Sequence, residues 1–159
     1  MTPVGRMPAL VIEDGTVLVE SSAIIDWLED SAPEGKRLLP ATGIARRNML
    51  QLIGRGTSIS EKGVNLVYER TRRLEEFHWG DYHARIESQI AADLAGLQFM
   101  APASGWFGGY APNAAEISIV IAVQFLQTAH PQLLGDAYPK LIALSEAADG
   151  FPAFAETRP

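Results

Sequence analysis

The sequence predicts a mainly α-helical protein that begins with a short β-hairpin and one helix. Residues 9–13 and 16–19 are rich in β-branched side chains, which favour strands. Asp14-Gly15 between them suits the positive φ angles of a type I′ hairpin turn. Beyond residue 43 the apolar residues recur at helical spacing. We therefore expect a two-stranded hairpin, a helix directly after it, and then a series of further helices.

The first helix is predicted to cover residues 21–30. Ser21 is a suitable N-cap, because its hydroxyl can accept an N–H group of the first turn. The apolar face of this helix is formed by Ile24, Trp27 and Leu28. Residues 32–35 contain a Pro and a Gly that end the helix, and residues 36–43 have the composition of a linker.

The remaining sequence carries amphipathic helical patterns separated by short breaks. The predicted helices cover residues 45–60, 61–74, 81–100, a segment beginning at Asn113, residues 138–149 and a last turn after Pro152. Gly54 and Gly56 weaken the first of these predictions, because glycine disfavours helix interiors. The charges of residues 69–76 alternate in sign, which is typical of a solvent-exposed helix face with i,i+4 pairs. Asn113 and Glu116 have the spacing of a capping box, so we assign both a structural role.

The composition argues against several classes of function. The net charge of −6 argues against a nucleic-acid-binding surface, which needs clustered Lys and Arg. The absence of cysteine excludes disulfides, Cys-x-x-Cys redox pairs and thiolate metal sites within this chain. The longest apolar run, residues 117–126, is too short for a membrane span, and no signal-peptide pattern follows Met1. We expect a soluble cytoplasmic protein without nucleic-acid or membrane partners.

Two clusters of residues each allow a functional and a structural interpretation. Residues 75–78 (Glu-Glu-Phe-His) and His83 could be drawn as a metal site, but the histidines share no ligand spacing and a solvated loop is the commoner outcome. Residues 106–110 (Trp-Phe-Gly-Gly-Tyr) lie in a Gly-rich loop and could form a stacking surface. A loop pinned by buried aromatic side chains is the commoner arrangement. We predict no metal site.

Four segments of the chain together resemble the glutathione transferase family. Residues 3–10 (Pro-Val-Gly-Arg-Met-Pro-Ala-Leu) are similar to the family's Pro-x-Gly-x-Val-Pro-x-Leu segment, with Met7 in place of the usual Val. Residues 20–24 (Glu-Ser-Ser-Ala-Ile) match its Glu-Ser-x-Ala-Ile helix start. Residues 113–116 and 138–154 resemble a capping box and the closing helices of its all-α domain. The likeness covers essentially the whole chain.

The resemblance implies a glutathione transferase-like all-α helical bundle preceded by part of a thioredoxin-like domain. Residues 1–35 would be the hairpin and helix of the glutathione-binding domain, residues 36–43 a linker, and residues 44–159 the all-α C-terminal domain. In the family, a strand, a helix and a second strand precede the segment that residues 3–10 match. The Tyr, Ser or Cys that activates the glutathione thiol lies in that part. We expect this chain to be an N-terminally truncated member without it.

The resemblance also implies a glutathione-binding site at Met7, Pro8, Glu20 and Ser21. Pro8 corresponds to the family's cis-proline, which aims the backbone of Met7 at the cysteinyl part of glutathione. Glu20 and Ser21 would hold the γ-glutamyl ammonium and carboxylate at a helix N-terminus. From the local residues alone, the alternatives are an ordinary trans-proline and a plain N-cap. Arg6 would either meet the glycine carboxylate of glutathione or be a solvated surface cation.

The family likeness suggests an activity and a second binding region. The family reaction is conjugation of the glutathione thiolate to an electrophile. Tyr68 and Arg72 would lie on the helix that lines the electrophile pocket, as candidates for contact with a small hydrophobic electrophile. We expect the chain to be weakly active or inactive alone; the alternative is a non-catalytic glutathione-binding or protein-interaction module. We expect a homodimer, with the strand edge of residues 9–12 paired with a second copy, buried in the dimer, or covered by the N-terminus.

Overall fold

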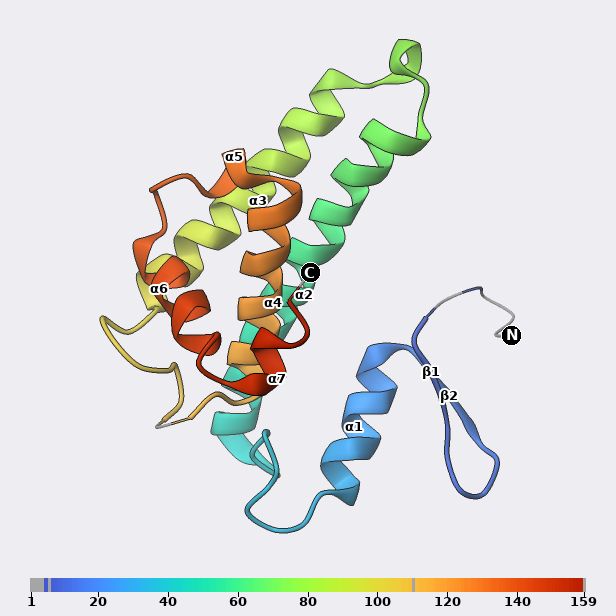
Figure 1. The fold of residues 1–159 in the computed structure, drawn as a ribbon, viewed down its shortest axis with the longest axis vertical. Coiled ribbons are helices and arrows are strands. Elements are labelled where there is room, and N and C mark those ends of the chain that lie inside the picture. The colour runs from blue at the N-terminus through green and yellow to red at the C-terminus, as the bar shows by residue number, and fades with distance from the viewer. Residues whose placement is uncertain (1–4, 6, 110, 159) are drawn as a thin grey trace. The chain divides into compact units, whose positions relative to one another are not determined.

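The computed structural model describes residues 5, 7–109 and 111–158 of the chain. The chain forms two compact units, residues 1–41 and residues 42–159 (Figure 1). The first contains a hairpin and one helix, and the second is built of helices. The predicted class, a mainly α-helical fold with a short two-stranded sheet at its start, is therefore confirmed. Among the described residues, no helix is both long and apolar enough to cross a membrane.

The first unit contains strands β1 (Ala9–Val11) and β2 (Val17–Val19), followed by helix α1 (Ser21–Ser31). The two strands are antiparallel, which confirms the predicted hairpin, although each is shorter than predicted. The prediction that Ser21 is the N-cap is wrong. Ser21 is the first helical residue, and Glu20 is the N-cap with a positive φ of 77°.

The hairpin turn differs from the predicted type I′ geometry. That turn needs a positive φ at Asp14, but Glu20 is the one described non-glycine residue with a positive φ. Instead, the Ile12 N–H donates to the Thr16 carbonyl at 3.0 Å, and Gly15 takes a φ of 85° within the loop. The Asp14 carboxylate accepts the Thr16 N–H at 2.8 Å. The extra loop residue shortens both strands.

The segment after α1 is fixed by one carboxylate of that helix. Glu29 accepts the backbone N–H groups of Leu38 and Leu39, each at 3.0 Å. Leu38 and Leu39 of the predicted linker are thus hydrogen-bonded to the last turn of the helix. Of the predicted apolar face, Ile24 and Trp27 are half-buried, whereas Leu28 remains 51% exposed.

The second unit is organised around a central apolar helix, α4. Its described elements are α2 (Gly43–Arg72), η1 (Glu75–Phe77), α3 (Gly80–Met100), α4 (Ala114–Ala129), α5 (Pro131–Leu134), α6 (Pro139–Ala148) and α7 (Pro152–Ala155). Helices α2, α5 and α6 contact α4, and α3 packs on α2 and α6. The largest fully buried apolar side chains of the core include Ile59, Ile90, Leu94, Leu97, Ile119, Leu126 and Leu141. The short elements α5 and η1 were not predicted, because a single turn carries no helical period.

Helix α2 is continuous, whereas two separate stretches, residues 45–60 and 61–74, were predicted. Its glycines mark a close approach to α4. A Cβ atom at Gly56 would lie 2.6 Å from the Ser118 hydroxyl and 2.7 Å from the Ser118 backbone, and one at Gly63 would lie 2.6 Å from the Phe125 ring. The close packing offsets the cost of glycine in a helix.

The predicted capping box at the start of α4 is confirmed. The Asn113 side chain accepts the Ala115 N–H at 2.8 Å, and the fully buried Glu116 carboxylate accepts the Asn113 N–H at 3.0 Å. The second Glu116 oxygen accepts the Gly108 N–H at 3.2 Å. Glu116 therefore holds the Gly-rich loop as well as the helix start, as expected for a structural residue.

The aromatic residues of the Gly-rich loop pack inward. Trp106 and Phe107 are half-buried against the core, and the Trp106 ring meets Phe151 edge-on with a centroid distance of 5.6 Å. Tyr110, the last aromatic residue of the predicted stacking surface, lies outside the described residues. For Trp106 and Phe107 the geometry agrees with a loop pinned by aromatic side chains.

Candidate functional site

The two motifs of the first unit meet at the base of the hairpin. The Met7–Pro8 peptide bond is cis. The Pro8 carbonyl accepts the Glu20 N–H at 3.2 Å, directly beyond the paired residues Ala9 and Val19. The hairpin therefore brings residues 7–8 beside the start of α1, although eleven residues separate Pro8 from Glu20 in the sequence. Arg6, the further candidate of this region, lies outside the described residues.

The start of α1 is chemically suited to an anion. The helix has no side-chain cap hydrogen bond at its N-terminus, and the first N–H groups of a helix lack intrahelical partners. Ser21 and Ser22 are exposed, so their hydroxyls are accessible beside these groups. Aligned N–H groups and the helix dipole favour a carboxylate there. Met7 is 88% exposed on the neighbouring segment.

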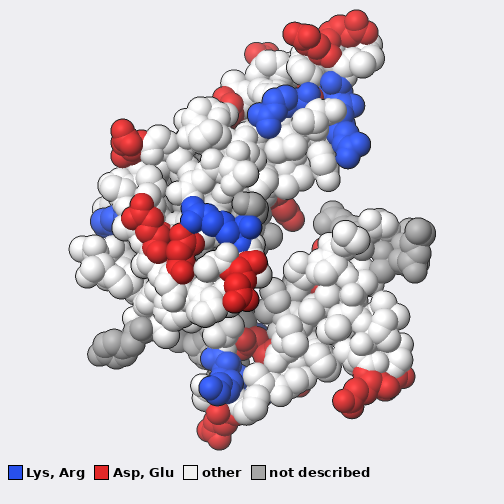
Figure 2. Space-filling model, viewed as in Figure 1, with Lys and Arg blue, Asp and Glu red and all other residues white. Residues whose placement is uncertain are grey.

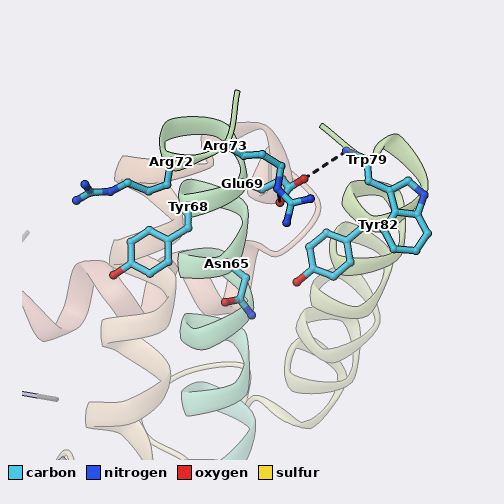
Figure 3. Close-up of a pocket in the computed structure, with 7 residues that line it drawn as sticks. All are labelled: Asn65, Tyr68, Glu69, Arg72, Arg73, Trp79 and Tyr82. Atoms are coloured by element: carbon cyan, nitrogen blue, oxygen red, sulfur yellow. Dashed lines mark hydrogen bonds and ion pairs between the residues drawn. The ribbon is translucent and has the colours of Figure 1, made fainter. Parts of the chain in front are cut away.

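The second unit contains a cleft of about 650 Å³ at the end where α2 turns into α3. Its lining is formed by Asn65, Tyr68, Glu69, Arg72, Arg73, Trp79 and Tyr82. Tyr68 and Arg72, the two candidates from the sequence, both line it. Figure 3 shows Tyr68 and Tyr82 on opposite sides of Asn65, with Arg72, Arg73 and Glu69 near the end of α2. The other lining residues were missed.

Glu69 is the best-anchored side chain of this cleft. It is 5% exposed, so the prediction that residues 69–76 form a solvent-exposed helix face is wrong at this position. Its carboxylate lies 3.0 Å from the Arg73 Nε and accepts the Trp79 N–H at 3.3 Å (Figure 3). The pairing with Arg73 is one of the predicted i,i+4 pairs. The alternating charges of residues 69–76 led to the prediction that Glu69 is exposed. Its helical spacing from Asn65 and Arg72, which also line the cleft, could have indicated that Glu69 is part of the lining.

The histidines occupy three different environments. His78 is exposed and its Nε2 lies 3.2 Å from the Arg73 carbonyl oxygen, while the His83 ring lies 6.2 Å from the His78 ring. His130 is buried between α4 and α5, with its Nε2 2.9 Å from the Gly63 carbonyl oxygen. Within the described ranges, no three His, Asp or Glu side chains come together as a metal-binding group.

Comparison with known proteins agrees with this fold. Residues 1–31 match the family model described as glutathione S-transferase, N-terminal domain. A maleylacetoacetate isomerase of Pseudomonas aeruginosa is 26% identical over 165 residues, which cover 100% of this chain and 74% of the relative.

Two solved structures extend the comparison to three dimensions. A glutathione transferase family member of Pseudomonas fluorescens Pf-5, solved with S-(propanoic acid)-glutathione, is 31% identical, with a TM-score of 0.89 over 99% of this chain and 79% of the other. A glutathione S-transferase of Methylobacterium radiotolerans, in complex with glutathione sulfonate, is 26% identical, with a TM-score of 0.90 over 99% and 74%. The chain belongs to the glutathione transferase family.

Proposed function

We propose that this chain binds glutathione through Met7, Pro8, Glu20 and Ser21. The observation that carries the proposal is the hydrogen bond from the Glu20 N–H to the Pro8 carbonyl, which joins the two family motifs into one surface. The open start of α1 supplies donors for a carboxylate. Similar structures were solved with glutathione derivatives, which supports the same ligand class here.

Each residue has a distinct role in this proposal. The backbone N–H and C=O of Met7 pair with the cysteinyl backbone of glutathione, as an added strand would. The cis geometry before Pro8 aims that backbone at the ligand. The Ser21 hydroxyl and the N–H groups of α1 hold the γ-glutamyl carboxylate, and the Glu20 carboxylate takes the γ-glutamyl ammonium.

The proposed reaction class is transfer of the glutathione thiolate to an electrophile, or an isomerisation, which is the reaction that the name of the Pseudomonas aeruginosa relative gives. In this proposal the α2–α3 cleft with Tyr68 and Arg72 receives the second substrate. The family likeness assigns none of the described residues to thiol activation. We therefore propose that the 159-residue polypeptide binds glutathione but turns over slowly. The second candidate is a binding module without catalysis.

Three further features belong to the same proposal. Residues 1–35 and 44–159 act as the glutathione-binding and all-α domains, joined by residues 36–43. The protein is cytoplasmic, in keeping with its acidic, cysteine-free composition. It works as a homodimer, because the β1 edge would otherwise offer unpaired backbone groups.

Calorimetric titration with glutathione tests the proposal. Ser21→Ala removes the hydroxyl beside the γ-glutamyl carboxylate, and we expect it to weaken binding by about fivefold. Ser22→Ala is the matched control, since Ser22 is also exposed at the helix start but has no assigned contact. Equal affinities of the two variants would remove Ser21 from the site. Parallel assays of thiol conjugation separate the two candidates, because rapid turnover by this polypeptide would exclude the binding module.

A further inference from the structure

The turn between α2 and α3, residues 73–79, exposes three large apolar side chains. Leu74 is 65% exposed, Phe77 is 61% exposed and Trp79 is 60% exposed. Figure 1 shows this turn at one end of the second unit, beyond helices α4–α7. Single exposed apolar residues are ordinary on a protein surface, whereas a cluster of large ones is typical of an interaction site. The α2–α3 turn is therefore a candidate for contact with a partner.

Hydrogen bonds hold the backbone of the α2–α3 turn in place. The Glu69 carboxylate accepts the Trp79 N–H at 3.3 Å and lies 3.0 Å from the Arg73 Nε. The Arg73 Nη1 donates to the Phe77 carbonyl at 3.4 Å. The Phe77 N–H donates to the Leu74 carbonyl at 2.9 Å. An ordered backbone thus presents the apolar side chains, and a surface that is already ordered loses less conformational entropy when it binds a partner.

The charged side chains of this region form a basic group and an acidic group. Arg70 and Arg72 lie in the last turn of α2, whereas Glu75 and Glu76 are the first two residues of η1. Within the described part of the chain, none of these four side chains makes an ion pair or a hydrogen bond. Figure 2 shows basic side chains beside the turn and acidic side chains at its tip. In Figure 3 the Arg72 guanidinium points away from the middle of the cleft, so both groups are open to a partner.

We propose that the α2–α3 turn binds the α2–α3 turn of a second copy of this chain, with the two turns side by side about a two-fold axis. In such a contact each pair of residues occurs twice, once in each direction. The basic group of each copy (Arg70 and Arg72) faces the acidic group of the other (Glu75 and Glu76). The apolar side chains of both turns form the centre of the contact.

This contact is separate from the proposed homodimer through β1. The β1 edge belongs to the first unit, whereas the α2–α3 turn belongs to the second. The inference therefore goes beyond the proposed function and does not involve glutathione. If both contacts form, two β1-paired dimers associate through their α2–α3 turns.

A second copy fits this surface better than a lipid bilayer does. Exposed Trp, Phe and Leu with neighbouring arginines would suit a membrane interface. However, Glu75 and Glu76 lie at the tip of the turn, where they would meet anionic headgroups first and be repelled. On a second copy the same two carboxylates meet arginines. Aromatic residues and arginine are also the types most enriched at protein–protein interfaces.

Sedimentation velocity of the whole chain over a range of concentrations tests the proposal. Phe77→Glu places a charge at the centre of the contact, and we expect it to raise the dissociation constant of self-association about tenfold. Phe99→Glu is the matched control, because Phe99 is 88% exposed near the other end of α3. It should change the dissociation constant by less than about twofold. Circular dichroism checks that both variants are folded.

An exchange of charges tests the pairing between the two copies. The double variant Arg70→Glu/Arg72→Glu and the double variant Glu75→Arg/Glu76→Arg each bring like charges together across the contact. We expect each to weaken self-association about tenfold. An equimolar mixture of the two should associate at least as tightly as the wild-type chain, because one variant is then acidic and the other basic throughout this surface.

Equal self-association of Phe77→Glu, Phe99→Glu and the wild-type chain up to about 1 mM would overturn the proposal. A mixture of the two charge variants that associates no better than either variant alone would also overturn it. Binding to phosphatidylglycerol vesicles that is lost in Phe77→Glu, without self-association of the wild-type chain, would assign the turn to a lipid surface instead. Phe77→Glu should halve the wild-type mass whether or not the β1 edges pair, so a failure of the β1 contact is recognised separately.

Discussion

The backbone conformation of Glu20 shapes the proposed binding site. Its φ of 77° lies in a region that costs a non-glycine residue about 1–3 kcal/mol. The conformation turns the chain from β2 into α1 and lets the Glu20 N–H reach the Pro8 carbonyl. Strained residues of this kind cluster at ligand sites, where the surrounding structure maintains them. The position of Glu20 therefore fits a binding surface better than a plain helix cap.

Asp14 in the hairpin turn provides a prediction about pH. The Thr16 hydroxyl, and then the Thr16 N–H, stabilise the carboxylate and lower the pKa of Asp14 below its usual range. A lowered folded-state pKa means that Asp14 contributes stability above its unfolded pKa, and that this contribution is lost as the pH falls through the folded value. A carbon-detected NMR titration should show the lowered midpoint, and Thr16→Val should raise it. An unchanged midpoint in that variant would contradict the assignment.

At the scale of helices, the α2–α4 contact explains a glycine that weakened the sequence prediction. Gly56→Ala would place a Cβ atom 2.7 Å from the Ser118 backbone, which cannot move away as a flexible side chain could. We expect a loss of about 1–3 kcal/mol in the free energy of unfolding. Gly54→Ala is the matched control, because nothing lies within 4 Å of its Cβ position.

Urea unfolding of the two variants checks this prediction. Gly54→Ala should stabilise the protein by up to about 1 kcal/mol, since alanine is the better helix former. The two substitutions, both in α2, are therefore expected to change the free energy of unfolding in opposite directions. Stabilisation of both variants would contradict the close approach of α2 and α4.

Predictions from the sequence succeeded where a local pattern is sufficient. The Asn113–Glu116 spacing identified the capping box, and the Asp14-Gly15 pair identified the hairpin. They failed where a contact distant in sequence decides the outcome. Glu69 lies in a charge pattern that is typical of surface residues, yet its carboxylate contacts the Trp79 N–H and the Arg73 guanidinium. The predicted break after residue 60 does not occur. Gly56 and Gly63 lie within the continuous helix α2, where both face α4.

At the scale of the whole chain, the two units carry different parts of the proposed chemistry. The first presents backbone groups and a helix start at residues 7–8 and 20–21, and the second presents the cleft between α2 and α3. The family motifs could be recognised from the sequence, because they are short and contiguous. The cleft could not, because Trp79 and Tyr82 reach it through the turn between two helices.

An NMR titration of the ¹⁵N-labelled chain with glutathione tests the central claim most directly. We predict that the amide signals of Met7, Ser21 and Ser22 shift together and fit one dissociation constant. Glutathione-induced shifts confined to the second unit, or none at residues 7 and 21–22 at saturating glutathione, would contradict the proposed binding site.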